Sequence, residues 1–171
     1  MPFRERESNE SGLVGIGVDI TDRCNRRCRK CFATLNNRDM AIKVFHRIAN
    51  EGVRLNFLEL YILGGEPCVR PDIVEILRYG IERFKVVILV TNADHLANAD
   101  LCRQIAETGV VVAAQRHTIA TDQCAREMEM FLCGGDHLDT SIVGWENIQK
   151  YFPASRICVQ CCIIKPVVKS G

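Results

Sequence analysis

Residues 13–32 read LVGIGVDITDRCNRRCRKCF, an apolar run that passes directly into a polar loop carrying three cysteines. Residues 13–20 predict a strand, because they are mostly apolar and end at a polar segment. Residues 21–37, named here the cysteine loop, hold Cys24, Cys28 and Cys31 within eight positions. Parallel sheets bind their ligands at the carboxyl ends of their strands. The segment therefore defines a first strand and a candidate site beside it.

Beyond this segment, short apolar strands alternate with amphipathic helices. We expect strands at residues 55–63, 86–90, 110–114 and 156–164, and helices at residues 39–50, from about 71, 98–107, from about 121 and 141–152. This order predicts right-handed crossovers and a parallel α/β sheet with outer helices. Such strands fit either an open doubly wound sheet or an incomplete barrel, and periodicity alone does not choose between them.

Capping residues and apolar stripes predict where the helices end and which side they bury. Gly52 is expected just past the first helix, in a left-handed cap. Thr121 and Asp122 are expected to cap a later helix that ends at Gly134 and Gly135. That helix is expected to carry one apolar side, made of Cys124, Met128, Phe131 and Leu132.

Length and composition indicate one globular domain. The 171 residues are 47% hydrophobic and 25% charged. We expect residues 1–12 to form a flexible polar leader and residues 13–171 a single domain. Net charge is only +1, so no global field favours nucleic acid, and no apolar run is long enough to span a bilayer. The start lacks the apolar stretch of a signal peptide, so a cytoplasmic protein is expected.

The ten cysteines fall into two settings. Three lie in the basic cysteine loop, and packing as small hydrophobes is the favoured interpretation for the others. These others are Cys68, Cys102, Cys124, Cys133, Cys158, Cys161 and Cys162. The last three suggest an auxiliary metal cluster, but strand alternation points Cys161 away from the other two. Packing is therefore favoured there, and the auxiliary cluster stays open.

Three thiolates in one short loop predict a metal centre. Soft thiolates favour zinc or an iron–sulfur cluster, and closed structural zinc sites want four ligands. A four-iron cluster held by three cysteines leaves one iron open to a small molecule. Basic residues surround the ligands and either offset the thiolate charge or merely solvate the loop. They are Arg23, Arg26, Arg27, Arg29 and Lys30.

Polar residues and glycines also follow the later strands. Gly64, Gly65, Glu66 and Pro67, named here the GGEP loop, come after the second strand. Thr91 and Asn92 end the third, and residues 115–117 end the fourth. Because the strands are expected to be parallel, these loops should converge with the cysteine loop at one mouth.

Residues 21–32, TDRCNRRCRKCF, resemble the cluster-binding loop of radical S-adenosylmethionine (SAM) enzymes. The GGEP loop is similar to that family's GGEP signature, and the pair Thr91-Asn92 is similar to its TN pair. Three motifs in this order, each after a strand, make the resemblance specific. The resemblance covers residues 13–164 and implies a partial (β/α)6 barrel. The chain stops before a sixth strand, so we expect the last strand to be missing and the chain to be a fragment.

The resemblance also implies the chemistry. Cys24, Cys28 and Cys31 would each bind one iron of a [4Fe-4S] cluster, and SAM would chelate the fourth. An electron from a donor such as flavodoxin or ferredoxin would cleave SAM to methionine and a 5′-deoxyadenosyl radical, which abstracts hydrogen from an unknown substrate. The cofactor carries this chemistry. No catalytic residues beyond the cluster ligands are expected.

Several residues are candidates for SAM contacts by the same resemblance. They are Phe32, Gly64, Gly65, Glu66, Pro67, Thr91, Asn92, Gln115 and Arg116. Lys30 occupies the position before the third cysteine that is often aromatic, and Phe32 either takes over the adenine contact or is core. Glu66 either bonds the SAM amino group or closes its loop, and Asn92 either reaches SAM or caps the next turn. Arg116 is a candidate for the SAM carboxylate.

Other classes of function compete with this interpretation. The chain is alternatively a non-catalytic iron–sulfur or zinc protein that serves in electron transfer or structure. The GGEP loop argues against that class, because a metal-binding loop alone does not need it. A fragment that holds the cluster but binds SAM poorly is a further possibility. The substrate stays open, and His117 is expected to be structural rather than catalytic.

Overall fold

The computed structural model describes residues 14–31, 33–118 and 121–161. Several expectations lie outside these ranges: the leader at residues 1–12, the adenine contact of Phe32, the position of Cys162 and the end of the last strand at residues 162–164.

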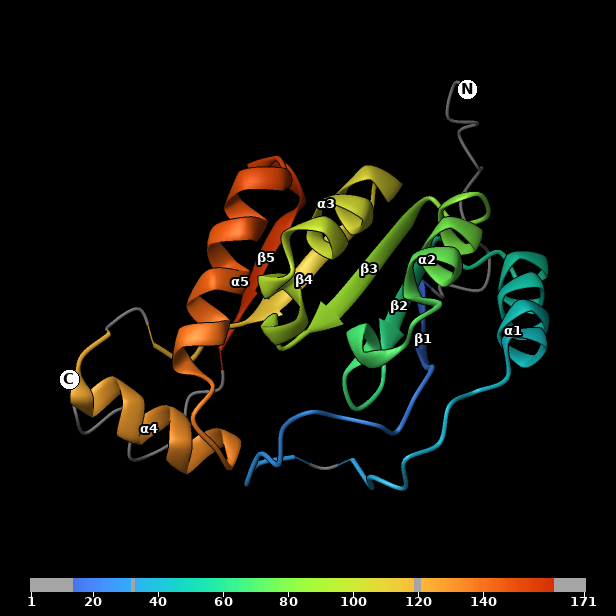
Figure 1. Ribbon diagram of the computed structural model, residues 1–171. Helices are drawn as coiled ribbons and strands as arrows, with labels where there is room; N and C mark the ends of the chain where they lie inside the picture. Colours follow the sequence, from blue (N-terminus) through green and yellow to red (C-terminus); the bar gives the residue numbers. More distant parts are fainter. Residues whose placement is uncertain (1–13, 32, 119–120, 162–171) are drawn as a thin grey trace.

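Five parallel strands form one sheet, in the order β1-β2-β3-β4-β5 (Figure 1). They are β1 (Gly15–Asp19), β2 (Glu59–Leu63), β3 (Val86–Thr91), β4 (Val111–Gln115) and β5 (Ile157–Gln160). The predicted parallel α/β architecture is confirmed. A doubly wound sheet reverses its strand order at a switch point, whereas this order follows the sequence from one edge to the other. The strand order therefore favours the incomplete barrel.

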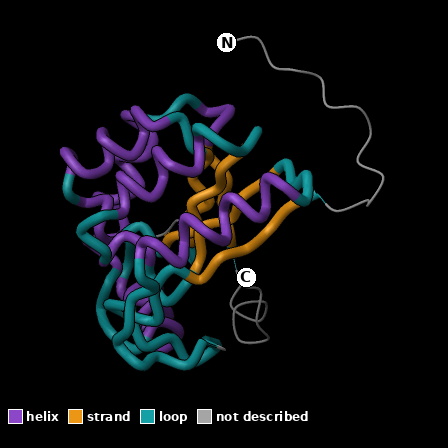
Figure 2. Tube along the Cα trace, turned by 90° about the vertical axis from the view of Figure 1, so that its right-hand side faces the viewer, coloured by secondary structure: helices purple, strands orange, loops and turns teal. Residues whose placement is uncertain are grey.

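Helices connect the strands and cover the sheet. The structure contains α1 (Ile42–Arg54), α2 (Ile73–Ile81), α3 (Ala99–Thr108), α4 (Gln123–Cys133) and α5 (Leu138–Tyr151). Short 3-10 helices lie at η1 (Pro67–Val69), η2 (Asp94–Ala97) and η3 (Ala154–Arg156). Figure 1 shows α4 apart from the other helices, beside the loops at the strand arrowheads. In Figure 2 these loops gather at one end of the strands. None of the described helices is long and apolar enough to cross a membrane.

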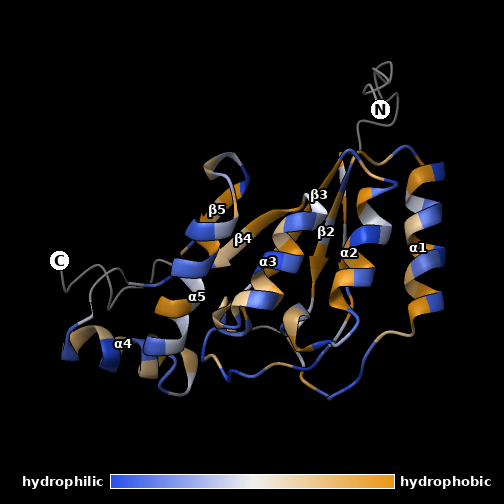
Figure 3. Ribbon diagram, turned by 45° about the horizontal axis from the view of Figure 1, so that its top comes forward, coloured by the Kyte–Doolittle hydropathy of each residue, from blue (hydrophilic) through white to orange (hydrophobic). Residues whose placement is uncertain are grey.

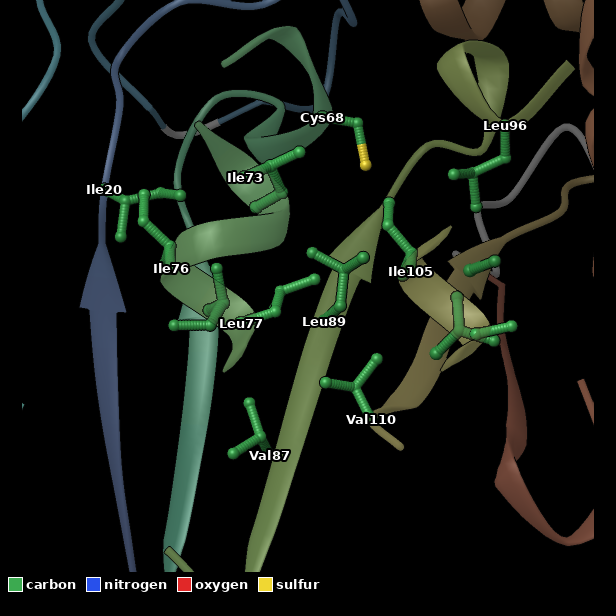
Figure 4. Packing of buried hydrophobic residues seen from close by; sticks show 14 of the residues in the cluster. Ile20, Cys68, Ile73, Ile76, Leu77, Val87, Leu89, Leu96, Ile105 and Val110 are labelled. Atoms are coloured by element: carbon green, nitrogen blue, oxygen red, sulfur yellow. The ribbon is translucent and has the colours of Figure 1, made fainter. Parts of the chain in front are cut away.

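The hydrophobic core lies between the sheet and the helices that cover it. Figure 4 shows Leu77 of α2 beside Leu89 of β3, and Ile20 beside Ile76. All four side chains are fully buried. In Figure 3 the strands are largely hydrophobic, whereas the helices carry hydrophilic residues as well. Removing this apolar surface from water is the main stabilising contribution to the fold.

The first helix ends later than the sequence predicts. Gly52 lies inside α1, so the expected left-handed cap there is wrong. A Cβ atom at this position would lie 3.1 Å from Cζ of Phe84, so Gly52 permits close packing rather than a turn. The left-handed conformation falls on Asn56, with φ of 62°. Because α1 extends to Arg54, β2 begins at Glu59 rather than at residue 55.

The predicted apolar side of α4 is confirmed for Leu132 and wrong for Cys124 and Phe131. Its buried residues are Ala125, Glu129, Leu132 and Cys133. Cys124 is exposed, and Phe131 is 46% exposed. The stripe fails because α4 buries a mixed polar face on the cysteine loop. The predicted caps are confirmed: the carboxylate of Asp122 accepts from Ala125 N, and Gly134 is left-handed.

Burial divides the scattered cysteines. Cys68, Cys102 and Cys133 are buried, as expected of packing residues. Cys124, Cys158 and Cys161 are exposed, so packing does not explain them. Cys158 lies on β5, an edge strand of the described sheet, and Cys161 follows this strand directly. Both side chains are exposed to solvent in the described part of the chain.

Candidate functional site

The cysteine loop and the GGEP loop are joined through their backbones. The pairing of β1 with β2 continues beyond the strands, because Gly65 N donates to Thr21 O at 2.8 Å and Glu66 N donates to Arg23 O at 2.8 Å. A Cβ atom on Gly64 or Gly65 would lie 2.3 Å from a carbonyl oxygen of the cysteine loop. Both positions therefore require glycine for this close approach.

Glu66 ties the end of β2 to the end of β3. Its buried carboxylate accepts hydrogen bonds from Cys68 N at 3.0 Å, Thr91 Oγ1 at 2.7 Å and Asn92 N at 2.7 Å. Burial raises the pKa of Glu66, and these hydrogen bonds oppose the rise. Two roles were considered for Glu66, bonding the SAM amino group and closing its loop. In the structure its carboxylate closes the loop.

Asn92 lies between the third strand and the cysteine loop. Its Oδ1 accepts from Asp94 N at 3.0 Å, so the side chain caps the following turn. Its Nδ2 donates to Oδ1 of Asn25 at 2.8 Å and lies 4.0 Å from Sγ of Cys24. The TN pair thus adjoins the first cysteine, as the convergence of the loops predicts.

Arg26 is 2% exposed and forms a buried ionic network. Its Nε donates to Oδ2 of Asp94 at 2.9 Å, a second ion pair joins Nη2 to Oδ1 of Asp94, and Nη1 donates to Oε1 of Glu129 at 2.9 Å. Its Nη2 also donates to Asn92 O at 3.2 Å. Desolvation lowers the pKa of Arg26, but its hydrogen bonds to Asp94 and the nearby carboxylate charges outweigh this, so the pKa is raised. Of the two roles left open for the basic residues, merely solvating the loop is wrong for Arg26, because its side chain is buried.

The three cysteines differ in environment. Cys24 and Cys28 are half-buried, and Cys31 is exposed. A hydrogen bond from Cys133 lowers the pKa of Cys28 to about 7, helped by the charges of Arg26 and Lys30 and opposed by burial. Burial raises the pKa of Cys24. The charges of Arg26 and Lys30 thus act on Cys28 in the direction that favours a thiolate.

The donor set fits an iron–sulfur cluster. Among the described residues, no three His, Cys, Asp or Glu side chains gather closely enough to hold one metal ion. A four-iron cluster instead takes each thiolate on a separate iron, and sulfur is the donor it requires. Cys24, Cys28 and Cys31 supply three sulfur donors from one loop, and the Arg26 charge acts on Cys28.

In the loop after β4, His117 contacts the cysteine loop. Nζ of Lys30 lies 2.9 Å from Nε2 of His117, and burial, with the Lys30 charge, lowers the pKa of His117. Arg116 instead donates to Thr118 O at 3.0 Å, and its guanidinium lies 5.6 Å from the ring centre of Trp145. Gln115 O accepts from Trp145 as well, at 3.3 Å. Trp145 of α5 thus contacts both Gln115 and Arg116.

Sequence reasoning missed five members of the site, namely Asn25, Asp94, Glu129, Cys133 and His137. Asn25 and His137 each contact Oδ2 of Asp94, at 2.7 Å and 3.1 Å, and Glu129 and Cys133 complete the surroundings of Arg26. One feature of the sequence could have identified Glu129 as a member of the site. Glu129 shares a helix face with Ala125, four residues before it, and with Leu132 and Cys133. A carboxylate on the buried side of a helix requires a cationic partner.

A family model described as the radical SAM superfamily matches residues 18–160. The chain is 29% identical over 143 residues to a probable GTP 3′,8-cyclase of Pyrococcus abyssi, covering 82% of this chain and 45% of that protein. It is 36% identical over 67 residues to the PqqA peptide cyclase of Methylorubrum extorquens strain PA1, covering 37% of this chain and 17% of that protein. The probable GTP 3′,8-cyclases align with most of this chain. The chain spans about half of their length.

Solved structures share the fold. TYW1 with a lysine–pyruvate adduct superposes with a TM-score of 0.66 at 15% identity, covering 95% of this chain and 61% of that chain. The structure of anSMEcpe with bound AdoMet and the Cp18Cys peptide gives a TM-score of 0.65 at 17% identity, covering 87% of this chain and 42% of that chain.

The Arg26 network should control the stability of the domain. Replacing Arg26 with Met leaves Asp94 and Glu129 buried without a counter-charge, so we expect Arg26→Met to lose roughly 3–5 kcal/mol of unfolding free energy in urea titrations. Arg27→Met is the matched control, because Arg27 is the exposed neighbour in the same loop. Equal losses in the two variants would contradict the assigned role of Arg26.

Gly65 should be intolerant of a side chain. In Gly65→Ala the new Cβ meets Arg23 O at 2.3 Å, so the two loops must separate, at a cost of about 1–3 kcal/mol in unfolding free energy. Gly17→Ala is the control, because its Cβ meets only the end of the Leu63 side chain, which can move. A Gly65→Ala protein as stable as Gly17→Ala would show that the loops are not held in contact.

Proposed function

The chain belongs to the radical SAM superfamily, and from that membership we propose that it binds a [4Fe-4S] cluster through Cys24, Cys28 and Cys31 and cleaves SAM reductively. The observation that carries this proposal is the backbone pairing of the cysteine loop with the GGEP loop. It supports the proposal because it joins the start of the cysteine loop to the GGEP loop, although the two motifs are about forty residues apart in the sequence.

When bound and reduced, the cluster supplies the electron that breaks a carbon–sulfur bond of SAM, and the resulting 5′-deoxyadenosyl radical abstracts hydrogen from the substrate. The residues of the chain orient the reactants and exclude water. Arg26 and Lys30 contribute positive charge that favours the thiolate of Cys28. The buried Asp94–Arg26–Glu129 network fixes the loop between Cys24 and Cys28.

SAM is proposed to lie along the GGEP loop and the TN pair. Because the Glu66 carboxylate is engaged by Thr91, Cys68 N and Asn92 N, the GGEP loop would contact SAM through its backbone. The side chain of Asn92 lies close to Cys24 and Asn25. This position supports a contact between Asn92 and SAM beside the proposed cluster. Phe32, Gln115 and Arg116 remain proposals from family resemblance.

We further propose that residues 13–171 form one core domain, located in the cytoplasm. A flavodoxin or ferredoxin would supply the electron. The relative that aligns over 82% of this chain is a probable GTP 3′,8-cyclase, which makes GTP the first substrate to test.

The test is reductive cleavage of SAM. The chain is reconstituted anaerobically with iron and sulfide and given dithionite and SAM, with and without GTP, and 5′-deoxyadenosine is quantified. We expect product from the wild type and at least a hundredfold less from Cys28→Ala, because that variant lacks one cluster ligand. Cys124→Ala, which removes an exposed cysteine of α4, is the matched control and should retain activity.

Two results would contradict the proposal. A cluster that forms without yielding 5′-deoxyadenosine would favour a non-catalytic iron–sulfur protein. Binding of zinc in place of iron would favour a structural metal site. This zinc binding would be abolished by Cys28→Ala and unaffected by Cys124→Ala.

A further inference from the structure

The carboxyl end of α4 presents two large apolar side chains to solvent. Met130 is 48% exposed and Phe131 is 46% exposed, and both lie in the last turn of the helix. Figure 1 shows α4 apart from the other helices, beside the loops that follow the strands. Adjoining apolar side chains on a surface are a common mark of an interaction site. These two residues are named here the α4 surface.

Positive charge lies beside the α4 surface. The guanidinium of Arg29 is 4.4 Å from the centre of the Phe131 ring, a cation–π contact. Arg27 is exposed in the same loop, and its Nη1 donates to two backbone carbonyl oxygens, each at 2.9 Å. Within the described part of the chain, neither guanidinium pairs with a carboxylate. Arg126, earlier on α4, is different, because two aspartates neutralise it.

Backbone hydrogen bonds connect the same turn of α4 to the ligand-bearing loop. Arg27 N and Arg29 N donate to the carbonyl oxygens of the last two helical residues, at 3.1 Å and 3.0 Å. The helix thus holds the backbone on both sides of Cys28, and Cys31 is exposed nearby in the sequence. Electron transfer slows steeply with distance, so a protein that delivers an electron must dock close to these cysteines. The α4 surface offers a docking position of that kind.

We propose that the α4 surface, together with Arg27 and Arg29, is the docking surface for a small acidic electron-carrier protein of the flavodoxin type. This inference rests on the proposed function, because it takes the bound cluster as the acceptor of the electron. In that step the partner loses one electron, the cluster gains it, and no atom is transferred.

The chemistry of the surface favours this partner. Opposite charges accelerate the encounter of two proteins, and transient electron-transfer complexes need only a small interface, which two apolar side chains can centre. A second copy of the chain is disfavoured, because a two-fold interface at the α4 surface would bring the positive charges of Arg27 and Arg29 together with those of the other copy.

The test compares a protein donor with a small chemical reductant. The dissociation constant of flavodoxin for the reconstituted chain is measured by isothermal titration calorimetry, and 5′-deoxyadenosine is quantified with reduced flavodoxin or with dithionite. We expect Phe131→Glu, which removes the ring and places a negative charge beside Arg29, to weaken flavodoxin binding about tenfold. Its yield with limiting flavodoxin should fall, whereas its yield with dithionite should equal that of the wild type.

Leu55→Glu is the matched control. Leu55 is 45% exposed and lies between α1 and β2, at the opposite end of the strands from the cysteine loop. This variant should bind flavodoxin as the wild type does. Added salt should weaken binding of the wild type more than binding of Phe131→Glu, because salt screens the attraction between exposed charges.

Glu127→Lys tests the charge while keeping the Phe131 ring. Glu127 is exposed on α4, one helical turn before Phe131. Its replacement adds positive charge beside the α4 surface, so flavodoxin should bind more tightly than it binds the wild type. This variant also serves if Phe131→Glu does not fold.

The proposal is overturned if Phe131→Glu binds flavodoxin as tightly as Leu55→Glu does, or if Glu127→Lys does not bind it more tightly than the wild type. It is also overturned if the wild type is a dimer that Phe131→Glu dissociates, because the surface would then bind a second copy. A wild type that yields no 5′-deoxyadenosine with dithionite would instead contradict the proposed function, and the calorimetry would still decide the docking surface.

Discussion

The guanidinium of Arg26 is the group around which the site is organised. It is buried between Asp94 of η2 and Glu129 of α4, and it also binds the carbonyl of Asn92 at the end of β3. Removing such charges from water is costly unless each finds its partner, so only the arrangement that brings these elements together is stable. Arg26 lies between Cys24 and Cys28, so the network that satisfies its charge also fixes the ligand-bearing loop.

The remainder of the site is built mainly from backbone groups and buried polar side chains. Gly65 and Glu66 extend the β1–β2 pairing into the cysteine loop, and Glu66 joins that assembly to β3. Such a construction suits a protein whose cofactor performs the chemistry, because the chain then has to hold and orient rather than react. It is consistent with membership of the radical SAM superfamily.

The comparisons describe a shared core rather than a shared substrate. One similar protein is named for cyclising GTP and another for cyclising a peptide, and the chain covers less than half of either. The proposed roles of the cysteine loop, the GGEP loop and the TN pair concern the cluster and SAM rather than a substrate. Lys30, which occupies a position that is often aromatic in the family, has its Nζ 2.9 Å from Nε2 of His117.

The sequence alone predicts the parallel order of strands and helices. The three cysteines, the GGEP loop and the TN pair are also recognisable in it as motifs. These are local patterns, because periodicity, glycines and cysteine spacing are read within one segment. Sequence reasoning misplaced Gly52 and most of the buried side of α4, it gave Asp94 and Glu129 no role, and it did not distinguish Arg26 from the other basic residues of the cysteine loop. Arg26 lies 68 residues from Asp94 and 103 residues from Glu129, and α4 packs on a loop rather than on the sheet. Only the tertiary structure decides such contacts, because buried charges must find partners in space rather than in sequence.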